Sequence, residues 1–484
     1  MLTINNNTAR LKREILVRIA RFQLAGKLSE GVHSIPRELA PAGSPSIRCC
    51  AYHDREILRQ RVIARLGCSL EEYDEEKRLA DYVTEALARE KPTWPMLTVL
   101  DLACNACVRA HFMVTNACQA CLARPCLANC GKKAIAITGG RAHIDEEKCV
   151  NCGLCLHNCP YHAIIQIPVP CEESCPVGAV ARGEKGKQRI DYHKCIFCGN
   201  CMRECPFGAM MDKSQLVDVI KHILAQKTVI ALYAPAAASQ FRTAPGQLEG
   251  ALLAAGFSQV LEVAWGADIT AEKEAAEFTE RLEKGETMMT TSCCPAYVRA
   301  VRRHTPALED CISSTRTPLH YTAEIAKKEN PQGITVFIGP CLAKRREGMD
   351  DEYVDYVISI EELHALFIAK EIDPAKAAPA PGKRLPTSWG RNFAKSGGVA
   401  QAVKARLKEP SRLKETLIDG LDKAGMQRLA EFGKIHSGAV PPGPDTPNLI
   451  EVMACKGGCI AGPSVIINPK AAISQLTKYA EKGL

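Results

Sequence analysis

Two adjacent cysteines, Cys293 and Cys294, carry the most informative chemistry of this sequence. Metal clusters normally take their thiolates from spaced cysteines, because neighbouring side chains cannot easily reach one cluster together. The doublet therefore predicts one cysteine that binds a metal and one that stays a free thiol. A free thiol has a pKa of about 8.5 that its surroundings can lower, so it can donate and accept a proton.

Two further cysteine segments lie downstream of the doublet. They are Gly339-Pro-Cys-Leu-Ala-Lys-Arg-Arg-Glu347 and Glu451-Val-Met-Ala-Cys-Lys-Gly-Gly-Cys459. Together with the doublet, and in this order, they resemble the signature segments of FeFe hydrogenases, the enzymes that interconvert dihydrogen with protons and electrons. The resemblance covers roughly residues 214–470 and the cysteine-rich region before them.

The resemblance implies a catalytic cofactor, the H-cluster. In it a 4Fe–4S cubane is joined through one cysteine sulfur to a two-iron unit that carries carbon monoxide, cyanide and a bridging dithiolate. Cys293 would be the free, proton-shuttling thiol, and Lys344 would donate to a cyanide. The cubane ligands would be Cys294, Cys341, Cys455 and Cys459, with Cys459 bridging to the two-iron unit, and further cofactor contacts would come from Pro235, Ala236, Lys344 and Met453. Gly457 and Gly458 suit a close approach of backbone to a bulky cofactor, because they lack a Cβ.

A proton relay is also implied by the resemblance. It would run from Cys293 through Glu274 and Ser313 to Glu277. Glu274 and Glu277 are spaced i,i+3 on an expected helix, so their side chains share a face. From spacing alone, a solvated helix face is the alternative interpretation of these two glutamates.

The sequence departs from the family pattern around the expected cofactor. Tyr297 replaces a tryptophan, Gly339 a methionine, Leu319 a glutamine and Ala236 a serine, and the glycine triplet after the last cysteine is Gly-Pro-Ser at 462–464. Residues around a metal site tune its potential and hydrogen bonding. These departures therefore indicate a divergent subgroup with altered potential, rate or oxygen sensitivity.

A cysteine-dense region precedes the catalytic segments. The runs Cys149-x2-Cys152-x2-Cys155-x3-Cys159-Pro and Cys195-x2-Cys198-x2-Cys201-x3-Cys205-Pro match the bacterial ferredoxin pattern. In that pattern three cysteines bind one 4Fe–4S cluster and the fourth binds the other cluster. Zinc is the alternative, but zinc normally needs only four ligands and does not need the proline.

Degenerate cysteine runs complete a nested arrangement. Cys104-x2-Cys107 and Cys171-x3-Cys175-Pro are the front and back of one ferredoxin half, so we expect a module at about 116–168 to be inserted into an outer module. About four accessory 4Fe–4S clusters would then carry electrons in line. Their expected ligand sets are Cys118, Cys121, Cys126 and Cys159; Cys149, Cys152, Cys155 and Cys130; Cys104, Cys107, Cys171 and Cys205; and Cys195, Cys198, Cys201 and Cys175. For the outer module, zinc or a site without metal is the alternative.

Three other cysteines, Cys49, Cys50 and Cys68, fit no ligand spacing. We interpret them as buried structural thiols, since free cysteine behaves as a small apolar residue. A further metal ligand is the alternative, and the sequence does not assign them a role.

The elements that must position these residues change along the chain. Residues 1–100 form a predicted N-terminal helical region, with helices at 10–27, 56–66 and 71–90 and a connection at 36–45 that is rich in helix breakers. Residues 101–212 form the α+β ferredoxin-like iron–sulfur region. It is too poor in apolar runs for an ordinary core, so its clusters would supply much of the folding energy.

Residues 213–484 are predicted to form an α/β catalytic domain of parallel sheets flanked by helices. Strands are expected at 228–233, 259–264, 287–291, 334–338 and 354–358, with helical patterns between them. Three motifs directly follow such strands, and ligands of open α/β sheets bind outside the carboxyl ends of strands. Distant segments can therefore converge on one site, which the resemblance places between two lobes. Residues 375–386, rich in Ala and Pro, are expected to be an exposed loop.

Composition narrows the function classes. The chain has 484 residues, 25 cysteines and a net charge of +8. An odd, high cysteine count in a reducing compartment points to metals rather than disulfides. We expect a cytoplasmic protein without a membrane span, because neither a secretory signal nor an apolar stretch of ~18 residues is present. The mixed charge does not indicate a nucleic-acid partner, and its mild positive balance favours an acidic electron carrier.

The sequence therefore predicts an FeFe hydrogenase that acts on dihydrogen and protons and passes electrons to an external carrier such as ferredoxin. Hydrogenase maturation proteins would install its two-iron unit. The alternative is a hydrogenase-like iron–sulfur scaffold, or a hydrogen or redox sensor, without substantial turnover. Scaffold relatives generally lack the free cysteine of the doublet, so the presence of Cys293 and Lys344 favours the enzyme.

Overall fold

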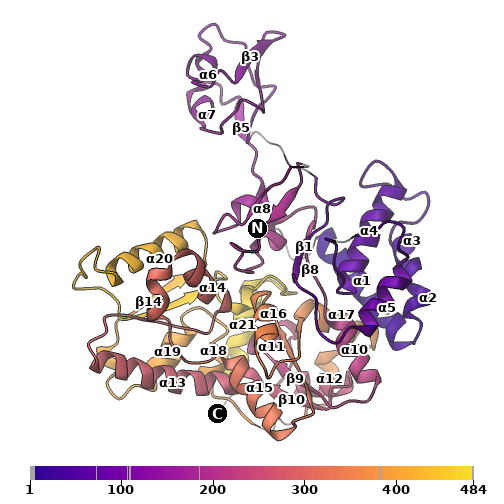
Figure 1. Ribbon diagram of the computed structural model, residues 1–484, viewed down its shortest axis with the longest axis vertical. Coiled ribbons are helices and arrows are strands. Elements are labelled where there is room, and N and C mark those ends of the chain that lie inside the picture. The colour runs from indigo at the N-terminus through magenta and orange to yellow at the C-terminus, as the bar shows by residue number, and fades with distance from the viewer. Residues whose placement is uncertain are drawn as a thin grey trace.

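A computed structural model describes residues 6–71, 73–105, 107, 111–184, 186–380, 382 and 384–481. The predicted regions 1–100, 101–212 and 213–484 each include residues outside this description, as do the helix predicted at 71–90 and the loop predicted at 375–386. Figure 1 shows a helical N-terminal region beside a larger body of helices and sheets, with one small module that stands away from both.

The described part of the N-terminal region contains five α-helices and a 3₁₀ turn. They are α1 (Asn7–Leu24), α2 (Leu28–Gly31), η1 (Val32–Ser34), α3 (Ile35–Leu39), α4 (Ala51–Arg65) and α5 (Leu79–Ala88). Ile15 and Ile19 lie at i and i+4 of α1 and are fully buried in a core shared with Val62 and Ile63 of α4. The helices predicted at 10–27 and 56–66 are confirmed.

Two other predictions in this region are wrong in part. Residues 36–45 are not only a connection, because α3 begins at Ile35 and carries Pro36 in its first turn, where the missing N–H is tolerated. The helix predicted at 71–90 begins only at Leu79. Acidic residues crowd the sequence from 71 to 76 and would repel one another on a helix. Arg59 instead holds residues 73–77 as a loop by donating to the hydroxyl of Tyr73 and the carbonyl of Lys77.

Two ferredoxin-like modules follow, and one is nested within the other. In each module the first and last strands pair antiparallel, and the two middle strands form an antiparallel hairpin. The outer module contains β1 (Leu97–Val99), α8 (Pro170–Glu173), β6 (Val180–Arg182), β7 (Gln188–Ile190), α9 (Asn200–Glu204) and β8 (Met210–Asp212). The inner module contains β2 (Phe112–Val114), α6 (Pro125–Ala128), β3 (Ile135–Thr138), β4 (Arg141–Ile144), α7 (Leu154–Asn158) and β5 (Ile164–Gln166). The inner module is the one that stands apart in Figure 1.

The body contains two parallel sheets. One has the strand order β10-β9-β12-β13 and the other β11-β15-β14. The strands are β9 (Val229–Tyr233), β10 (Gln259–Glu262), β11 (Met289–Thr290), β12 (Ile334–Gly339), β13 (Tyr356–Ser359), β14 (Glu415–Asp419) and β15 (Leu449–Met453). The predicted parallel sheets are confirmed, and the five predicted strands correspond to β9 to β13. The strands β14 and β15 were not predicted. β9 and β15 are buried along their whole length, as central strands of covered sheets should be.

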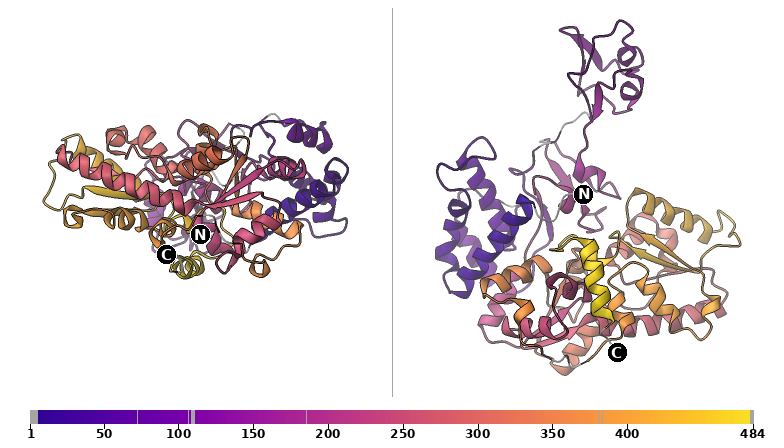
Figure 2. Two further views of the ribbon diagram at one scale, coloured as in Figure 1. Left: turned by 90° about the horizontal axis from the view of Figure 1, so that it is seen from below. Right: turned by 180° about the vertical axis from the view of Figure 1, so that it is seen from behind.

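Helices cover both sheets and connect them. They are α10 (Leu216–Leu224), α11 (Pro235–Phe241), α12 (Gln247–Ala254), α13 (Val263–Glu283), α14 (Pro295–His304), α15 (Pro318–Glu329), α16 (Ala343–Asp350), α17 (Ile360–Ala369), α18 (Ser388–Asn392), α19 (Gly398–Lys404), α20 (Lys423–His436) and α21 (Pro469–Ala480). The long helix α13 packs against α15, α18 and α19. The C-terminal helix α21, yellow in Figure 2, packs against α11 and α18.

The described residues of the loop predicted at 375–386 are mostly exposed, as expected. The loop begins with a short 3₁₀ turn, η3 (Pro374–Lys376), and Ala380 N–H donates to Gly246 at the start of α12 over 2.9 Å. No helix in the described part of the chain is long and apolar enough to cross a membrane.

A buried ion-pair cluster joins the three parts of the chain. Asp212 of β8 accepts from Arg65 of α4 over 2.9 Å and from Arg345 of α16 over 3.0 Å. Arg345 also pairs with Glu362 of α17. All four side chains are at most 2% exposed. Because an unpaired buried charge is costly, this cluster fixes the helical region, the outer module and the body relative to one another.

Candidate functional site

A cavity of about 100 Å³ lies between the two sheets of the body. Its walls come from the carboxyl ends of β9, β11, β12 and β15 and from the helices that follow them. The residues expected to bind the cofactor and the expected free thiol line it, namely Pro235, Ala236, Cys293, Cys294, Cys341, Lys344, Met453, Cys455 and Cys459, whereas Glu274, Ser313 and Glu277 of the expected relay are not among its lining residues. Segments that are far apart in sequence thus converge on one site, as the strand-end argument predicts.

Four of the five thiols among these residues, Cys294, Cys341, Cys455 and Cys459, crowd together. Burial raises the pKa of Cys455 well above its usual value, and the charges of Cys341, Cys459 and Cys294 raise it further. Burial, Cys341 and Cys294 likewise raise the pKa of Cys459 to about 12. Four buried thiolates would repel one another unless a cationic group lies between them. This donor set therefore fits an iron–sulfur cubane.

The turn between Cys455 and Cys459 depends on two glycines. Gly457 and Gly458 have φ values of 92° and 91°, a conformation that residues with a Cβ rarely adopt. A Cβ on Gly458 would lie 2.7 Å from the carbonyl oxygen of Ala394. The contact that requires glycine at 458 is therefore with the protein backbone at 394–395, in addition to any approach to a cofactor.

Cys293 lies at the cavity wall beside a buried carboxyl group. Burial, followed by the charge of Glu274, raises the pKa of Cys293 well above its usual value. Glu274 on α13 is fully buried, and burial raises its pKa to about 7. Its Oε1 accepts from the N–H of Ser292 over 3.1 Å and from the Ser292 hydroxyl over 3.3 Å, whereas Oε2 has no partner in the described residues. A carboxyl group with this pKa can hold or release a proton near neutral pH.

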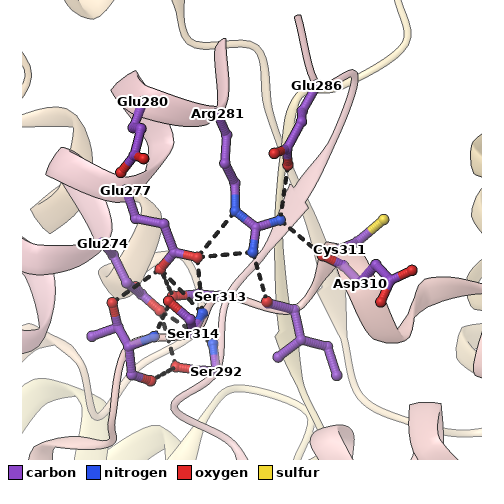
Figure 3. A network of polar contacts seen from close by, with 12 residues as sticks. Glu274, Glu277, Glu280, Arg281, Glu286, Ser292, Asp310, Cys311, Ser313 and Ser314 are labelled. Carbon is purple, nitrogen blue, oxygen red and sulfur yellow. Dashed lines mark hydrogen bonds and ion pairs between the residues drawn. The ribbon is translucent and has the colours of Figure 1, made fainter. Parts of the chain in front are cut away.

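Glu277 lies one helical turn further along α13 in a dense polar network, which Figure 3 shows. Its carboxylate accepts from the Ser313 hydroxyl over 2.7 Å and from the Ser314 N–H over 2.9 Å, and it pairs with Arg281 over 2.8 Å. Burial opposes ionisation, but these donors outweigh burial and lower the pKa of Glu277. Glu277 is therefore a charged carboxylate.

The four expected relay residues lie together, but their order of contact differs from the expected one. Ser313 bonds Glu277, while Glu274 bonds Ser292. The two halves meet at Thr315, whose carbonyl accepts from Ser292 over 2.6 Å and whose hydroxyl donates to Glu277 over 3.1 Å. Sequence reasoning missed both residues: Ser292 directly precedes the Cys293–Cys294 doublet but was given no role, and Thr315 lies in no motif with fixed spacing.

Lys344 projects into the cavity from the start of α16. Its ammonium group pairs with Glu347 over 2.7 Å, and Thr317 also donates to Glu347. Burial lowers the pKa of Lys344, but the charge of Glu347 outweighs burial and raises it. The cavity therefore contains one fixed cation, and Glu347 is a positioning residue that an i,i+3 search of this segment could have found.

The sequence departures shape the rest of the cavity. Leu319 and Phe337 line it, and the Phe337 ring occupies the space beside Gly339, where a Cβ would lie 2.7 Å from the ring. Tyr297 is fully buried and donates to the Thr290 hydroxyl over 2.7 Å. At Leu319 and Ala236 the wall is thus apolar where the family resemblance leads one to expect a glutamine and a serine.

The outer-module cysteines lie in two groups, one of which adjoins this cavity. Burial raises the pKa of Cys171 to about 12, together with the charges of Cys205, Cys107 and Cys104. Burial, Cys195 and Cys175 raise the pKa of Cys198 to about 12, and the same neighbours act on Cys201. Cys198 also lines the catalytic cavity, so the second group directly adjoins the catalytic site.

The inner module has its own cysteine groups. A cavity of about 30 Å³ is lined by Cys118, Cys121, Cys126 and Cys159. Burial raises the pKa of Cys155, and the nearby Cys149 and Cys152 raise it further. No described group of three or more His, Cys, Asp or Glu side chains is close enough to hold a single metal ion. The thiols of each group are thus spaced more widely than ligands of one ion.

One hydrogen bond recurs in all four ferredoxin halves. The last cysteine of each half accepts from the backbone N–H of an alanine four residues later, over 3.1–3.4 Å. The pairs are Cys130 with Ala134, Cys159 with Ala163, Cys175 with Ala179, and Cys205 with Ala209. Because N–H donors to cluster sulfur help to set its potential, the repeat suits four equivalent ligand positions.

The cysteines outside the ligand sets differ in burial, and two of them are not the buried structural thiols that we expected. Cys68 is buried, and burial raises its pKa to about 11, as a structural thiol requires. Cys49 and Cys50 are exposed, so their interpretation as buried thiols is wrong. They lie on the turn before α4, outside the helix whose apolar face is buried. Cys311, to which sequence reasoning assigned nothing, is buried in the core beside Leu308.

Comparisons with known proteins agree with this geometry. Residues 227–463 match the family model of the iron-only hydrogenase large subunit, C-terminal domain, and residues 142–165 and 189–211 match the 4Fe-4S binding domain. Iron hydrogenase 1 of Clostridium pasteurianum is 29% identical over 386 residues, which are 68% of this chain and 65% of that protein. The NADP-reducing hydrogenase subunit HndD of Solidesulfovibrio fructosivorans is 31% identical over 265 residues, which are 45% of each chain.

A third relative is the periplasmic [Fe] hydrogenase large subunit of Nitratidesulfovibrio vulgaris, 28% identical over 46% of this chain and 63% of that one. The chain thus spans less than two thirds of the length of these curated relatives. Among solved structures, a variant of [FeFe]-hydrogenase HydA1 from Chlamydomonas reinhardtii is similar over 54% of this chain and 88% of that one, with 20% identity and a TM-score of 0.44. That structural similarity is weak, so the assignment depends on the sequence matches and on the site. On these grounds the chain belongs to the iron-only, or FeFe, hydrogenase family.

Proposed function

We propose that this protein catalyses the reversible interconversion of dihydrogen with protons and electrons. The observation that carries the proposal is the convergence of Cys294, Cys341, Cys455 and Cys459 on one cavity that also holds Cys293 and Lys344. When bound, an H-cluster would supply the metal centre at which dihydrogen is split or formed. An enzyme that turns over dihydrogen needs a proton donor beside the cofactor, whereas a scaffold does not. The position of Cys293 at the cavity wall therefore supports the enzyme.

The protein's own residues would hold and orient the cofactor. The four cysteine thiolates would bind the cubane, and Lys344, fixed by Glu347, would donate to an anionic ligand on the two-iron unit. Leu319 and Phe337 would exclude water from the cavity. A dry cavity strengthens the interaction between a fixed ammonium group and an anion, because the local dielectric constant is low.

Proton movement would begin at Cys293 and continue to Glu274. The raised pKa of Glu274, about 7, lets it accept a proton from a thiol and release it again near neutral pH. Ser292 and Thr315 hold the two carboxyl groups of the exit in place, because Ser292 contacts Glu274 and donates to the Thr315 carbonyl while the Thr315 hydroxyl donates to Glu277. Ser313 and Arg281 would keep Glu277 ionised. We propose the four residues that the family resemblance implies as the exit and Ser292 and Thr315 as positioning residues, since a carbonyl oxygen accepts a hydrogen bond but has no proton to pass on.

Electron transfer would use the accessory cysteines in the ligand sets given above. The group that contains Cys198 adjoins the cavity, and the inner module lies farthest from the body, so we propose it as the contact with an external carrier such as ferredoxin. We also propose the domain limits 1–100, 101–212 and 213–484, and a reducing, cytoplasmic location in which the thiols stay available for metal. Installation of the two-iron unit would need maturation proteins.

Infrared spectroscopy of anaerobically matured protein tests the proposal. Bands of iron-bound carbon monoxide and cyanide, together with hydrogen evolution from reduced methyl viologen, are expected. Cys455→Ser should remove both, and Cys311→Ser, a buried cysteine outside the site, should keep both. Bands without turnover would favour the sensor, and the absence of bands after maturation would favour the iron–sulfur scaffold.

A further inference from the structure

Cys49 and Cys50 are adjacent thiols outside all of the ligand sets. Cys49 Sγ lies 3.9 Å from Cys50 Sγ and 3.2 Å from Nδ1 of His53. Both cysteines are exposed. The turn that carries them is fixed, because the N–H groups of Ile47 and Arg48 donate to the Asp54 carboxylate over 2.7 and 3.1 Å. Two sulfurs and an imidazole are therefore held together at the surface.

The turn is anchored beside the outer module without contributing ligands to it. The guanidinium group of Arg48 donates to the carbonyl of Ala103 over 2.7 Å and to the side chain of Asn105 over 2.6 Å. These residues flank Cys104, an expected cluster ligand. The sulfurs of the pair remain exposed to solvent, and no three-ligand metal group includes them in the described residues. A thiol reaction explains their arrangement better than metal binding does.

The two thiols differ in character. The backbone N–H of His53 lowers the pKa of Cys50, and the thiol of Cys49 lowers it further. The same sulfur–sulfur contact raises the pKa of Cys49. Cys50 is therefore the better nucleophile at neutral pH, since the thiolate is the reactive form. Cys49 has His53 beside it as an acceptor for its proton.

We propose that Cys49 and Cys50 form a redox-active dithiol that exchanges with small disulfides such as oxidised glutathione. The Cys50 thiolate attacks one sulfur of the disulfide, whose S–S bond breaks and releases one thiol. His53 then takes the proton of Cys49, and the Cys49 thiolate attacks Cys50 Sγ and releases the second thiol. The dithiol loses two electrons and two protons, and one disulfide becomes two thiols.

The product should be easily reduced. Consecutive Cα atoms are about 3.8 Å apart, whereas disulfides usually join Cα atoms about 4.4–6.8 Å apart. A disulfide between neighbours is therefore strained, and strained, exposed disulfides are the labile ones. This inference does not depend on the proposed hydrogenase activity, and it assigns the pair a reversible rather than a structural role.

Mass spectrometry of the full, cluster-loaded protein tests the inference. Trypsin cuts after Arg48 and Arg55 and releases both cysteines in the single peptide 49–55. After anaerobic treatment with oxidised glutathione and alkylation of free thiols, this peptide should lack two hydrogens and carry no alkyl group. Reduced glutathione should restore two alkylation sites. Iron content should not change, because the pair binds no cluster.

Variants separate the two steps. Cys49→Ser should stop at a mixed disulfide on Cys50, and His53→Ala should slow ring closure without slowing formation of that mixed disulfide. Cys68 is the internal control, since at pH 8 a thiol of pKa about 11 is ionised on the order of a hundredfold less than an unperturbed thiol of pKa about 8.5 and should react correspondingly more slowly. Two free thiols in peptide 49–55 after treatment, or oxidation only in protein that has lost iron, would overturn the inference.

Discussion

Replacement of Glu274 by glutamine probes the proton path at its most buried point. The amide keeps the size of the side chain and can still accept from Ser292 through its oxygen. The Oε2 position has no partner in the described residues, so an amide nitrogen there displaces no hydrogen bond. What Glu274→Gln removes is the ability to exchange a proton.

The expected loss of activity follows from the environment of this carboxyl group. A pKa of about 7 matches the operating pH, at which a relay group works best. Positioned acid–base groups contribute about 10²–10⁴-fold to a rate, and we expect Glu274→Gln to lower hydrogen evolution and uptake by that factor. Both directions should fall, since the same group must give and take the proton.

The same substitution changes how stability depends on pH. Burial raises the pKa of Glu274 in the folded protein, so between the unfolded value of 4.5 and about 7 only the folded state holds the proton. The free energy of unfolding therefore falls as pH rises through this window, by about 3 kcal/mol, and is flat above it. A glutamine at position 274 does not titrate, so it adds no such pH dependence to the free energy of unfolding. The apparent Tm of Glu274→Gln relative to wild type should thus be higher at pH 8 than at pH 5.

Viologen-linked hydrogen assays and infrared spectra of matured protein provide the measurement. Glu280→Gln is the matched control, because Glu280 lies on the exposed face of the same helix and pairs only with Lys284 among described residues. Glu280→Gln should behave like wild type in every assay. Activity of Glu274→Gln within a few fold of wild type, with intact infrared bands, would refute the relay and favour a merely structural carboxyl group.

The doublet, the cluster sets and the ion-pair core give further predictions. Cys293→Ser should keep iron and infrared bands but lose most turnover, because a hydroxyl is far less acidic than a thiol, whereas Cys294→Ser should lose iron; equal iron loss in both would contradict the division of roles. Iron analysis should give about twenty irons in the accessory and catalytic cubanes, at four irons in each cubane, and two more in the two-iron unit. Zinc bound by the ligand set that contains Cys104 would contradict the nested arrangement of modules. Asp212→Ala should destabilise the protein by about 3–5 kcal/mol, because it leaves Arg65 and Arg345 buried without their partner. Thermal unfolding beside Asp191→Ala, an exposed control, measures this effect, and equal melting of the two would contradict it.

Local patterns allowed much of the fold to be predicted. The helical spacing of Ile15 and Ile19 identified α1, and uninterrupted apolar runs identified β9 and β12. These features depend on residues close in sequence. β14 and β15 escaped prediction, since three of the five residues of β14 are polar and β15 overlaps the cysteine segment that begins at Glu451. The loop at 73–77 was also missed, because contacts from Arg59 on α4 replace the helix that its sequence pattern favours.

For the candidate site, residue types and spacing were sufficient to nominate the thiols but not their surroundings. The cysteine motifs by themselves determined a family and an expected ligand set, because loops of two or three residues fix how thiols can share a cluster. Tertiary structure alone decided that Cys293 lies beside a buried Glu274, that Ser292 rather than Ser313 contacts that carboxyl group, and that Cys49 and Cys50 are exposed. Burial and partner choice are set by packing between distant segments, and these set each pKa and each proton path.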